Sequence, residues 1–341
     1  MKIDVFCHIF PEQYYERMVA HAAAGGYMQK RVRGLDTLVN LERRFRLMDQ
    51  YPGYVQVLSL ASPPPEAVAG PQHAAELARV ANDGMADLVD RYPDRFPGFV
   101  ASLPMHEPDA AVQEAERAVG ALGATGVQIY TNVNGRPLDD PDYLPLFALM
   151  ARHDLPVWVH PARTPEHADY PTETRSKYDL WWALGWPYET SVFMGRMVFA
   201  GMFDRFPGLK LITHHMGGIV PYLEGRVGYG LDQLGRRTDD AEDLRARQAL
   251  RRRPLDYFRM FYADTALFGA LPATECGLAF FGADRVLFAT DFPFDPEGGA
   301  LFLPLTIRVI EDITASPDDK EKIFAGNARR LLRLKPSAGR D

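Results

Sequence analysis

The sequence predicts a single α/β domain of the (β/α)8 barrel class, and two observations lead to that prediction. Eight short runs of β-branched and aromatic residues, each bounded by Gly, Pro or Asp, recur along the 341-residue chain. Amphipathic helical patterns separate these runs, as in residues 75–92 and 109–122. Most of the runs are almost continuously apolar, which is typical of parallel strands covered on both faces. Eight such strands alternating with helices indicate a TIM-like barrel that occupies residues 1–341.

The eight predicted strands are spread over the whole chain. In order they are residues 2–7, 54–59, 98–102, 126–131, 156–160, 210–214, 260–264 and 285–290. Two connections, residues 9–53 and 161–209, are too long for plain loops between a strand and a helix. We therefore expect long insertions after strands 1 and 5, which would shape the substrate pocket.

The composition excludes several classes of protein. The chain has 38 Lys and Arg residues against 45 Asp and Glu residues, for a net charge of −7, which argues against a nucleic-acid partner. No apolar stretch approaches the roughly 20 residues that cross a bilayer, and Asp4 and His8 interrupt any signal-peptide core. Two cysteines, Cys7 and Cys276, fit a reducing compartment. We expect a cytoplasmic protein with no membrane partner.

Histidine and aspartate residues gather at the ends of the predicted strands. They are His8 after strand 1, His160 at the end of strand 5, His214 and His215 after strand 6, Asp264 at the end of strand 7 and Asp291 after strand 8. The carboxyl ends of barrel strands meet on one face, so these side chains are expected around one pocket. Imidazole and carboxylate groups are the ligands that zinc and neighbouring divalent metals prefer. The sequence therefore predicts a metal or catalytic site at this face.

Six stretches, in order along nearly the whole chain, carry a family resemblance. They are residues 3–8, 159–161, 213–221 and 289–294, with weaker matches at residues 185–190 and 326–332. Together they resemble the amidohydrolase-related (amidohydrolase 2) family, and within it aminocarboxymuconate semialdehyde decarboxylase and related aromatic-acid decarboxylases. The resemblance implies a barrel enzyme that uses a divalent metal.

The resemblance also implies roles for particular residues. The family holds its metal with a His-x-His pair after strand 1, a His after strand 5 and an Asp after strand 8, which match His8, His160 and Asp291. Its catalytic histidine matches His215, and Asp291 would also accept a proton. In the decarboxylase branch an arginine reaches the substrate carboxylate of the neighbouring subunit, which matches Arg226 and implies a homodimer. Arginine suits this role because its planar fork binds a carboxylate through two hydrogen bonds.

Phe6 stands where the resemblance implies the first histidine of the pair. Side chains alternate along a strand, so Phe6 and His8 would share a face while Cys7 points away. Three protein ligands and a water still make a normal catalytic zinc site, and Asp264 or His214 could supply a fourth. The missing ligand equally allows weak binding or none. We expect a divalent ion, zinc ahead of manganese or iron, with its occupancy open because of Phe6.

Other candidate residues have two interpretations each. Arg163 could bind a substrate anion or lie on the loop surface, and Trp186 could line an aromatic pocket or pack within its insertion. Asp264 could meet the substrate or cap the following segment. For His214 a structural position beside the matched histidine is the favoured interpretation. Arg226 could also lie on a solvent-facing helix.

Three functions are consistent with these residues. The first is metal-assisted, non-oxidative decarboxylation of an aromatic or enol-type carboxylic acid, with His215 or a metal-bound water supplying the proton. The second is hydrolysis of an ester, lactone or C–C bond, with Asp291 as general base. The third is a barrel that binds a partner without catalysis, which Phe6 favours and the retained His160, His215 and Asp291 oppose.

Overall fold

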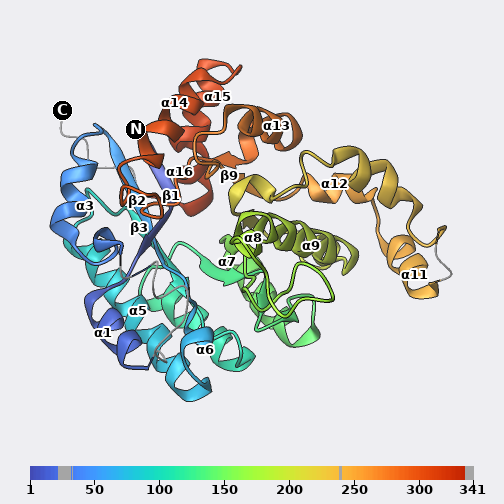
Figure 1. The fold of residues 1–341 in the computed structure, drawn as a ribbon, viewed down its shortest axis with the longest axis horizontal. Coiled ribbons are helices and arrows are strands. Elements are labelled where there is room, and N and C mark those ends of the chain that lie inside the picture. The colour runs from blue at the N-terminus through green and yellow to red at the C-terminus, as the bar shows by residue number, and fades with distance from the viewer. Residues whose placement is uncertain (22–31, 33, 238–239, 335–341) are drawn as a thin grey trace.

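Eight parallel strands form one sheet whose spatial order follows the sequence. The computed structural model describes residues 1–21, 32, 34–237 and 240–334 (Figure 1). Within these residues the strands are β1 (Lys2–Ile9), β2 (Tyr54–Leu60), β3 (Gly98–Ser102), β4 (Val127–Tyr130), β7 (Val157–His160), β8 (Leu211–Thr213), β9 (Tyr262–Asp264) and β10 (Val286–Leu287). All eight predicted strands are present, and the predicted TIM-like barrel is confirmed.

The sheet closes where the end of the chain returns to its beginning. Val5 N donates to Phe288 O at 3.0 Å, and His8 N donates to Phe292 O at 2.7 Å. Cys7 and Phe292 form a parallel bridge beyond the end of β10. These contacts join the first strand to the segment after the last strand and so complete the barrel.

The barrel interior is filled by apolar side chains from the strands. Trp158 Nε1 on β7 donates to Val5 O on β1 at 3.0 Å, although these strands are not neighbours in the sheet, so the indole crosses the interior. One buried cluster joins these two residues to Ile212 and to Leu331 and Leu332 of α16 (Asn327–Leu332). The C-terminal helix is therefore packed against the side chains that fill the barrel.

Helices cover the outside of the sheet. The two predicted helices are found as α5 (Pro71–Arg91) and α6 (Pro108–Ala121), and the others around the barrel are α4 (Pro65–Val68), α7 (Leu144–His153), α13 (Leu271–Phe281), α14 (Phe302–Asp312) and α15 (Pro317–Glu321). A small hairpin of β5 (Asn132–Val133) and β6 (Arg136–Pro137) follows β4. In the described part of the chain, no helix has the length and apolar character to cross a membrane.

Three connections at the carboxyl end of the barrel carry additional structure. The first contains α1 (Glu12–His21) and α3 (Leu41–Met48), although residues 22–31 and 33 of this predicted insertion lie outside the described residues. The second, after β7, contains α8 (Leu180–Ala183), α9 (Gly185–Phe199) and α10 (Met202–Arg205).

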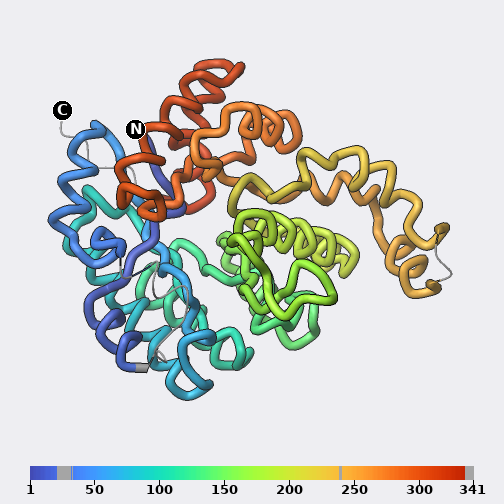
Figure 2. Tube along the Cα trace, in the orientation of Figure 1, coloured from blue at the N-terminus to red at the C-terminus, as the bar shows by residue number. Residues whose placement is uncertain are grey.

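The third connection, after β8, is a long excursion that the sequence analysis did not predict. It contains the 3-10 turn η3 (His215–Gly217), the π-helix η4 (Arg226–Gly230), η5 (Leu231–Gln233), α11 (Ala241–Ala249) and α12 (Pro254–Phe258). Its yellow-to-orange trace extends away from the barrel (Figures 1 and 2). α11 has no buried residue, so no apolar periodicity marks this helix in the sequence.

Candidate active site

The first and last parts of the barrel bring His8 and Asp291 together. His8 lies near the end of β1 and is fully buried; its Nε2 lies 3.1 Å from Asp291 Oδ1, and its Nδ1 lies 3.2 Å from Ser59 Oγ. Burial alone would raise the pKa of Asp291, but hydrogen bonds from His214 and His8 hold that pKa well below its usual value. Asp291 is therefore an ionised carboxylate in the described site at neutral pH.

His160 is the last residue of β7. Its Nδ1 lies 2.8 Å from Pro161 O, and a carbonyl only accepts, so Nδ1 carries the hydrogen and Nε2 keeps its lone pair. Burial, together with the neighbouring His214 and His8, lowers the pKa of His160 well below its usual value. The neutral imidazole that results is the form in which histidine binds a metal.

His214 and His215 follow β8 and lie face to face, with ring centroids 3.7 Å apart. His214 Nδ1 lies 2.5 Å from Asp264 Oδ2 and its Nε2 lies 3.4 Å from Asp291 Oδ1. Burial would lower the pKa of His214, but with no metal present the two carboxylates raise it to about 9, so an ion that binds Nε2 would displace a proton from it. His215 Nδ1 donates to Ala266 O at 2.7 Å, and burial and the adjacent His214 lower the pKa of His215 to about 4.

An unusual backbone conformation aims these side chains. His215 and Met216 both have a φ of 54°, followed by Gly217 at 74° and Gly218 at 65°, and Asp291 has a φ of 63°. The left-handed region is costly for residues with a Cβ and persists where the surroundings enforce it, which is common at functional sites. Because the strand ends at Thr213, the two consecutive histidines escape the alternation of a strand and lie on the same side.

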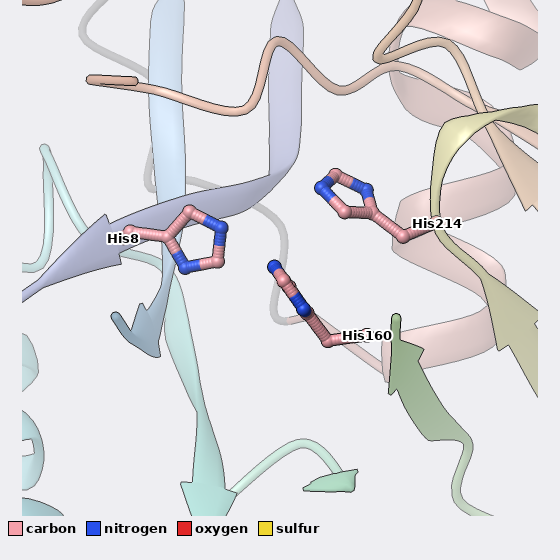
Figure 3. Close-up of side chains that lie close together, drawn as sticks. All are labelled: His8, His160 and His214. Carbon is pink, nitrogen blue, oxygen red and sulfur yellow. The ribbon is translucent and has the colours of Figure 1, made fainter. Parts of the chain in front are cut away.

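Ring nitrogens of three histidines face one another at the centre of this site (Figure 3). One ligand atom each from His8, His160 and His214 lies within 4.8 Å of the other two, and His214, His215 and Asp291 form a second group by the same measure. All five side chains are buried. Imidazole nitrogens and one carboxylate oxygen at this spacing fit a divalent metal of the first transition row.

Phe6 lies beside this cluster and gives it no donor atom. Its ring stacks on that of His214, with centroids 3.8 Å apart and planes 16° apart, and lies 5.6 Å from the ring of His8. Cys7 Sγ lies instead 3.7 Å from Tyr54 Oη. The predicted alternation along the first strand, with Phe6 and His8 on one face, is therefore found.

The other predicted residues are placed differently from one another. The Trp186 ring lies 5.4 Å from the ring of His160, so this tryptophan lies beside the histidine cluster. Arg163 Nη1 donates to Glu189 Oε1 at 2.8 Å, so its charge already has a partner. Arg226 is exposed at the start of η4, and within the described residues no side-chain hydrogen bond or ion pair ties it to the histidine cluster of its own chain.

Asp264 is fully buried and hydrogen-bonds to both consecutive histidines, His214 and His215. Its Oδ1 accepts from His215 N and from Ala266 N, both at 3.0 Å, while Oδ2 contacts His214 Nδ1. Sequence reasoning left this residue open and favoured a structural position for His214. The sequence signal that pointed to His214 was its position directly beside His215, in a pair of consecutive histidines at a strand end.

A barrel with buried imidazoles and a carboxylate at the carboxyl ends of its strands is the architecture of a metal-dependent hydrolase or lyase. Residues 3–334 match the sequence profile of the amidohydrolase family, and the chain belongs to that family. It is 34% identical to gamma-resorcylate decarboxylase of Polaromonas sp. over 308 residues, which cover 86% of this chain and 87% of that protein. It is 33% identical to 2-amino-3-carboxymuconate-6-semialdehyde decarboxylase of Dictyostelium discoideum over 79% of this chain and 70% of that one.

Solved structures show the same architecture. The 5-carboxyvanillate decarboxylase of Sphingomonas paucimobilis has a TM-score of 0.82 and 25% identity, covering 98% of this chain and 99% of its own. The dihydroxybenzoic acid decarboxylase of Polaromonas sp., solved with manganese and the inhibitor 2-nitroresorcinol, has a TM-score of 0.77 and 28% identity over 98% of both chains. The predicted family and its relation to decarboxylases are thereby confirmed.

Proposed function

We propose that the protein is a metal-dependent decarboxylase that releases CO2 from a hydroxylated aromatic acid. The relatives named above are decarboxylases and cover most of the chain. The observation that carries the proposal is the convergence of His8, His160 and Asp291 with a second histidine pair at the carboxyl end of a closed barrel. Resorcylate-type and carboxyvanillate-type acids are the proposed substrate class, by analogy with the relatives.

We assign the metal to His8, His160 and Asp291. A bound divalent ion would neutralise the substrate oxygens and draw electron density away from the bond that breaks. The donor set fits zinc, and manganese is the ion in two of the related structures, so both are candidates. The cytoplasm is the proposed compartment, which agrees with two cysteines that form no disulfide.

His215 is the proposed proton carrier. Its Nδ1 hydrogen is held by Ala266 O, and its lowered pKa leaves Nε2 unprotonated at neutral pH. Nε2 would take the proton of the substrate hydroxyl and pass it to the ring carbon that loses CO2. An electron pair of the ring forms the new C–H bond, the pair of the C–C bond returns to the ring as CO2 leaves, and solvent reprotonates the product phenolate. Asp291, as a second acceptor beside His8, is the alternative site for this proton.

Three further residues are proposed to bind the substrate. Trp186 beside His160 offers an aromatic wall. Arg226, exposed on its own chain, would reach the substrate carboxylate in the other subunit of a homodimer. Arg163 could bind an anion only by giving up its ion pair with Glu189.

Product analysis tests the proposal. Purified protein loaded with Mn2+ or Zn2+ is incubated with 2,6-dihydroxybenzoate and, separately, with 5-carboxyvanillate, and CO2 and the aromatic product are quantified. For the wild type we expect one CO2 for each molecule of aromatic product. For a His215→Asn variant that retains its metal we expect no CO2. Incorporation of labelled water oxygen into the organic product, without CO2, would instead support a hydrolase.

A further inference from the structure

We propose that His214 is a fourth protein ligand of the metal, so that three imidazoles and one carboxylate hold the ion. This inference rests on the metal site of the proposed function and adds a residue to it. Its first support is distance, because His214 belongs to both groups of ligand atoms that lie within 4.8 Å of one another. Its Nε2 lies 3.4 Å from Asp291 Oδ1, the same oxygen that lies 3.1 Å from His8 Nε2.

The second support is the partner of the other ring nitrogen. A histidine that binds a metal almost always directs its second ring nitrogen to a carboxylate, a carbonyl or a water, which fixes the ring and its tautomer. His8 contacts Ser59 Oγ in this way, and His160 donates to Pro161 O. His214 has the strongest such partner, since its Nδ1 lies 2.5 Å from the fully buried carboxylate of Asp264.

The third support is the position of Phe6. The rings of Phe6 and His214 are stacked and lie at similar distances from the rest of the cluster. The Phe6 ring is 5.6 Å from His8 and 6.2 Å from His160, whereas the His214 ring is 6.2 Å from His8 and 5.3 Å from His160. An apolar ring and a donor ring therefore occupy equivalent places beside the same centre. The donor that residue 6 does not supply is thus supplied by His214, the residue directly after β8.

Four protein ligands have a consequence for the choice of ion. A tetrahedral zinc site with four protein ligands is closed, as in structural zinc sites. An ion that accepts six ligands keeps two positions for substrate oxygens. We therefore expect Zn2+ to bind more tightly than Mn2+, and Mn2+ to support the faster reaction.

Metal affinity of purified variants tests the inference without relying on turnover. The apparent Kd for Zn2+ is measured by competition with a chromophoric chelator for the wild type and for His214→Phe, which keeps the aromatic stack. We expect a loss of more than tenfold, because even changes behind a ligand cost about 10–100-fold. Asp264→Asn should fall within that 10–100-fold range. His106→Phe is the negative control, since neither ring nitrogen of His106 has a hydrogen-bond partner in the described part of the chain and His106 lies outside the cluster.

Two further variants make the outcome decisive. The exchange Phe6→His with His214→Phe moves the donor to the other stacked ring and should restore most of the affinity. His160→Phe removes a ligand already assigned. If His160→Phe loses affinity and His214→Phe does not, the inference is wrong while the proposed metal site stands; if neither loses affinity, both are wrong. Should His214→Phe fail to fold, as judged by circular dichroism, His214→Asn replaces it, because Asn keeps a donor for Asp264 and lacks the second ring nitrogen.

Discussion

At the scale of single residues, much of the site was predictable and one part was not. His8, His160, His215 and Asp291 were found by one rule, that polar residues at the carboxyl ends of barrel strands share a pocket. His214 was left open between a fourth ligand and a structural position, and the structural position was favoured. Its ring stacks on that of His215 where the backbone turns left-handed at residue 215, and sequence patterns do not reveal such a conformation when no glycine marks it.

Glu66 gives a prediction at this scale. Its side chain is buried, its Oε2 has no hydrogen-bond partner among the described residues, and burial raises the pKa of Glu66 to about 8. The folded state therefore binds a proton more tightly than the unfolded state, so stability is lost as pH rises from about 4.5 to 8, by up to about 1.4 kcal/mol per pH unit. Glu66→Gln should remove this loss. Urea unfolding at pH 5.5, 6.5 and 7.5 should show a stability advantage of the variant that grows with pH.

The exposed Glu116 on α6 is the matched position, because no burial acts on its charge. Glu116→Gln should change the free energy of unfolding by a small amount that is the same at each of the three pH values. A Glu66→Gln variant whose advantage is the same at every pH would contradict the assignment of a buried, proton-binding carboxyl group.

At the scale of elements, the strands were predictable and the excursion after β8 was not. Apolar runs bounded by turn residues located every strand to within a few residues. Strand 8 was predicted over residues 285–290, but the observed strand β10 covers only Val286–Leu287, after which the chain turns toward Asp291. Within the excursion α11 lacks a buried face, so this helix carries neither of the periodicities that identify a packed element.

Gly218 provides a test of the turn that follows β8. It has a φ of 65°, and a Cβ there would lie 2.3 Å from Pro187 O at the start of α9. Gly218→Ala should destabilise the fold by about 2–4 kcal/mol, from backbone strain and from displacement of α9. Gly120→Ala on α6, where a Cβ meets nothing within 4 Å, is the control and should be stabilising by about 0.5–1 kcal/mol. Equal unfolding midpoints for the two variants would refute this role of Gly218.

At the scale of the whole molecule, the number of predicted strands was enough to predict that the sheet closes into a barrel. Eight parallel strands with helices between them have one common arrangement, and the barrel follows from it. Which side chains meet across the barrel could not be predicted in the same way, because contacts such as Trp158 with Val5 depend on how the interior is packed. Side-chain size, rather than sequence period, decides them.

The proposed homodimer yields a prediction at this scale. If Arg226 acts on the site of the partner, a dimer of one Arg226→Ala subunit and one His215→Asn subunit contains one site with both defects and one intact site. Two inactive preparations, dissociated and reassembled together, should recover about a quarter of wild-type activity, since random pairing makes half of the dimers mixed. Size-exclusion chromatography verifies the dimer. Activity that does not recover on mixing would place Arg226 in its own subunit's site, whereas an Arg226→Ala preparation that is active by itself would place Arg226 outside catalysis.

The join between the first and last strands sets the order in which the enzyme matures on the ribosome. His8 is synthesised 283 residues before Asp291, the carboxylate that it contacts, and the segment that bonds to β1 is also made much later than β1 itself. A nascent chain that stops before residue 291 lacks both the last side of the barrel and the carboxylate. The proposed metal centre, which includes Asp291, would consequently be complete only after residue 291 has been made.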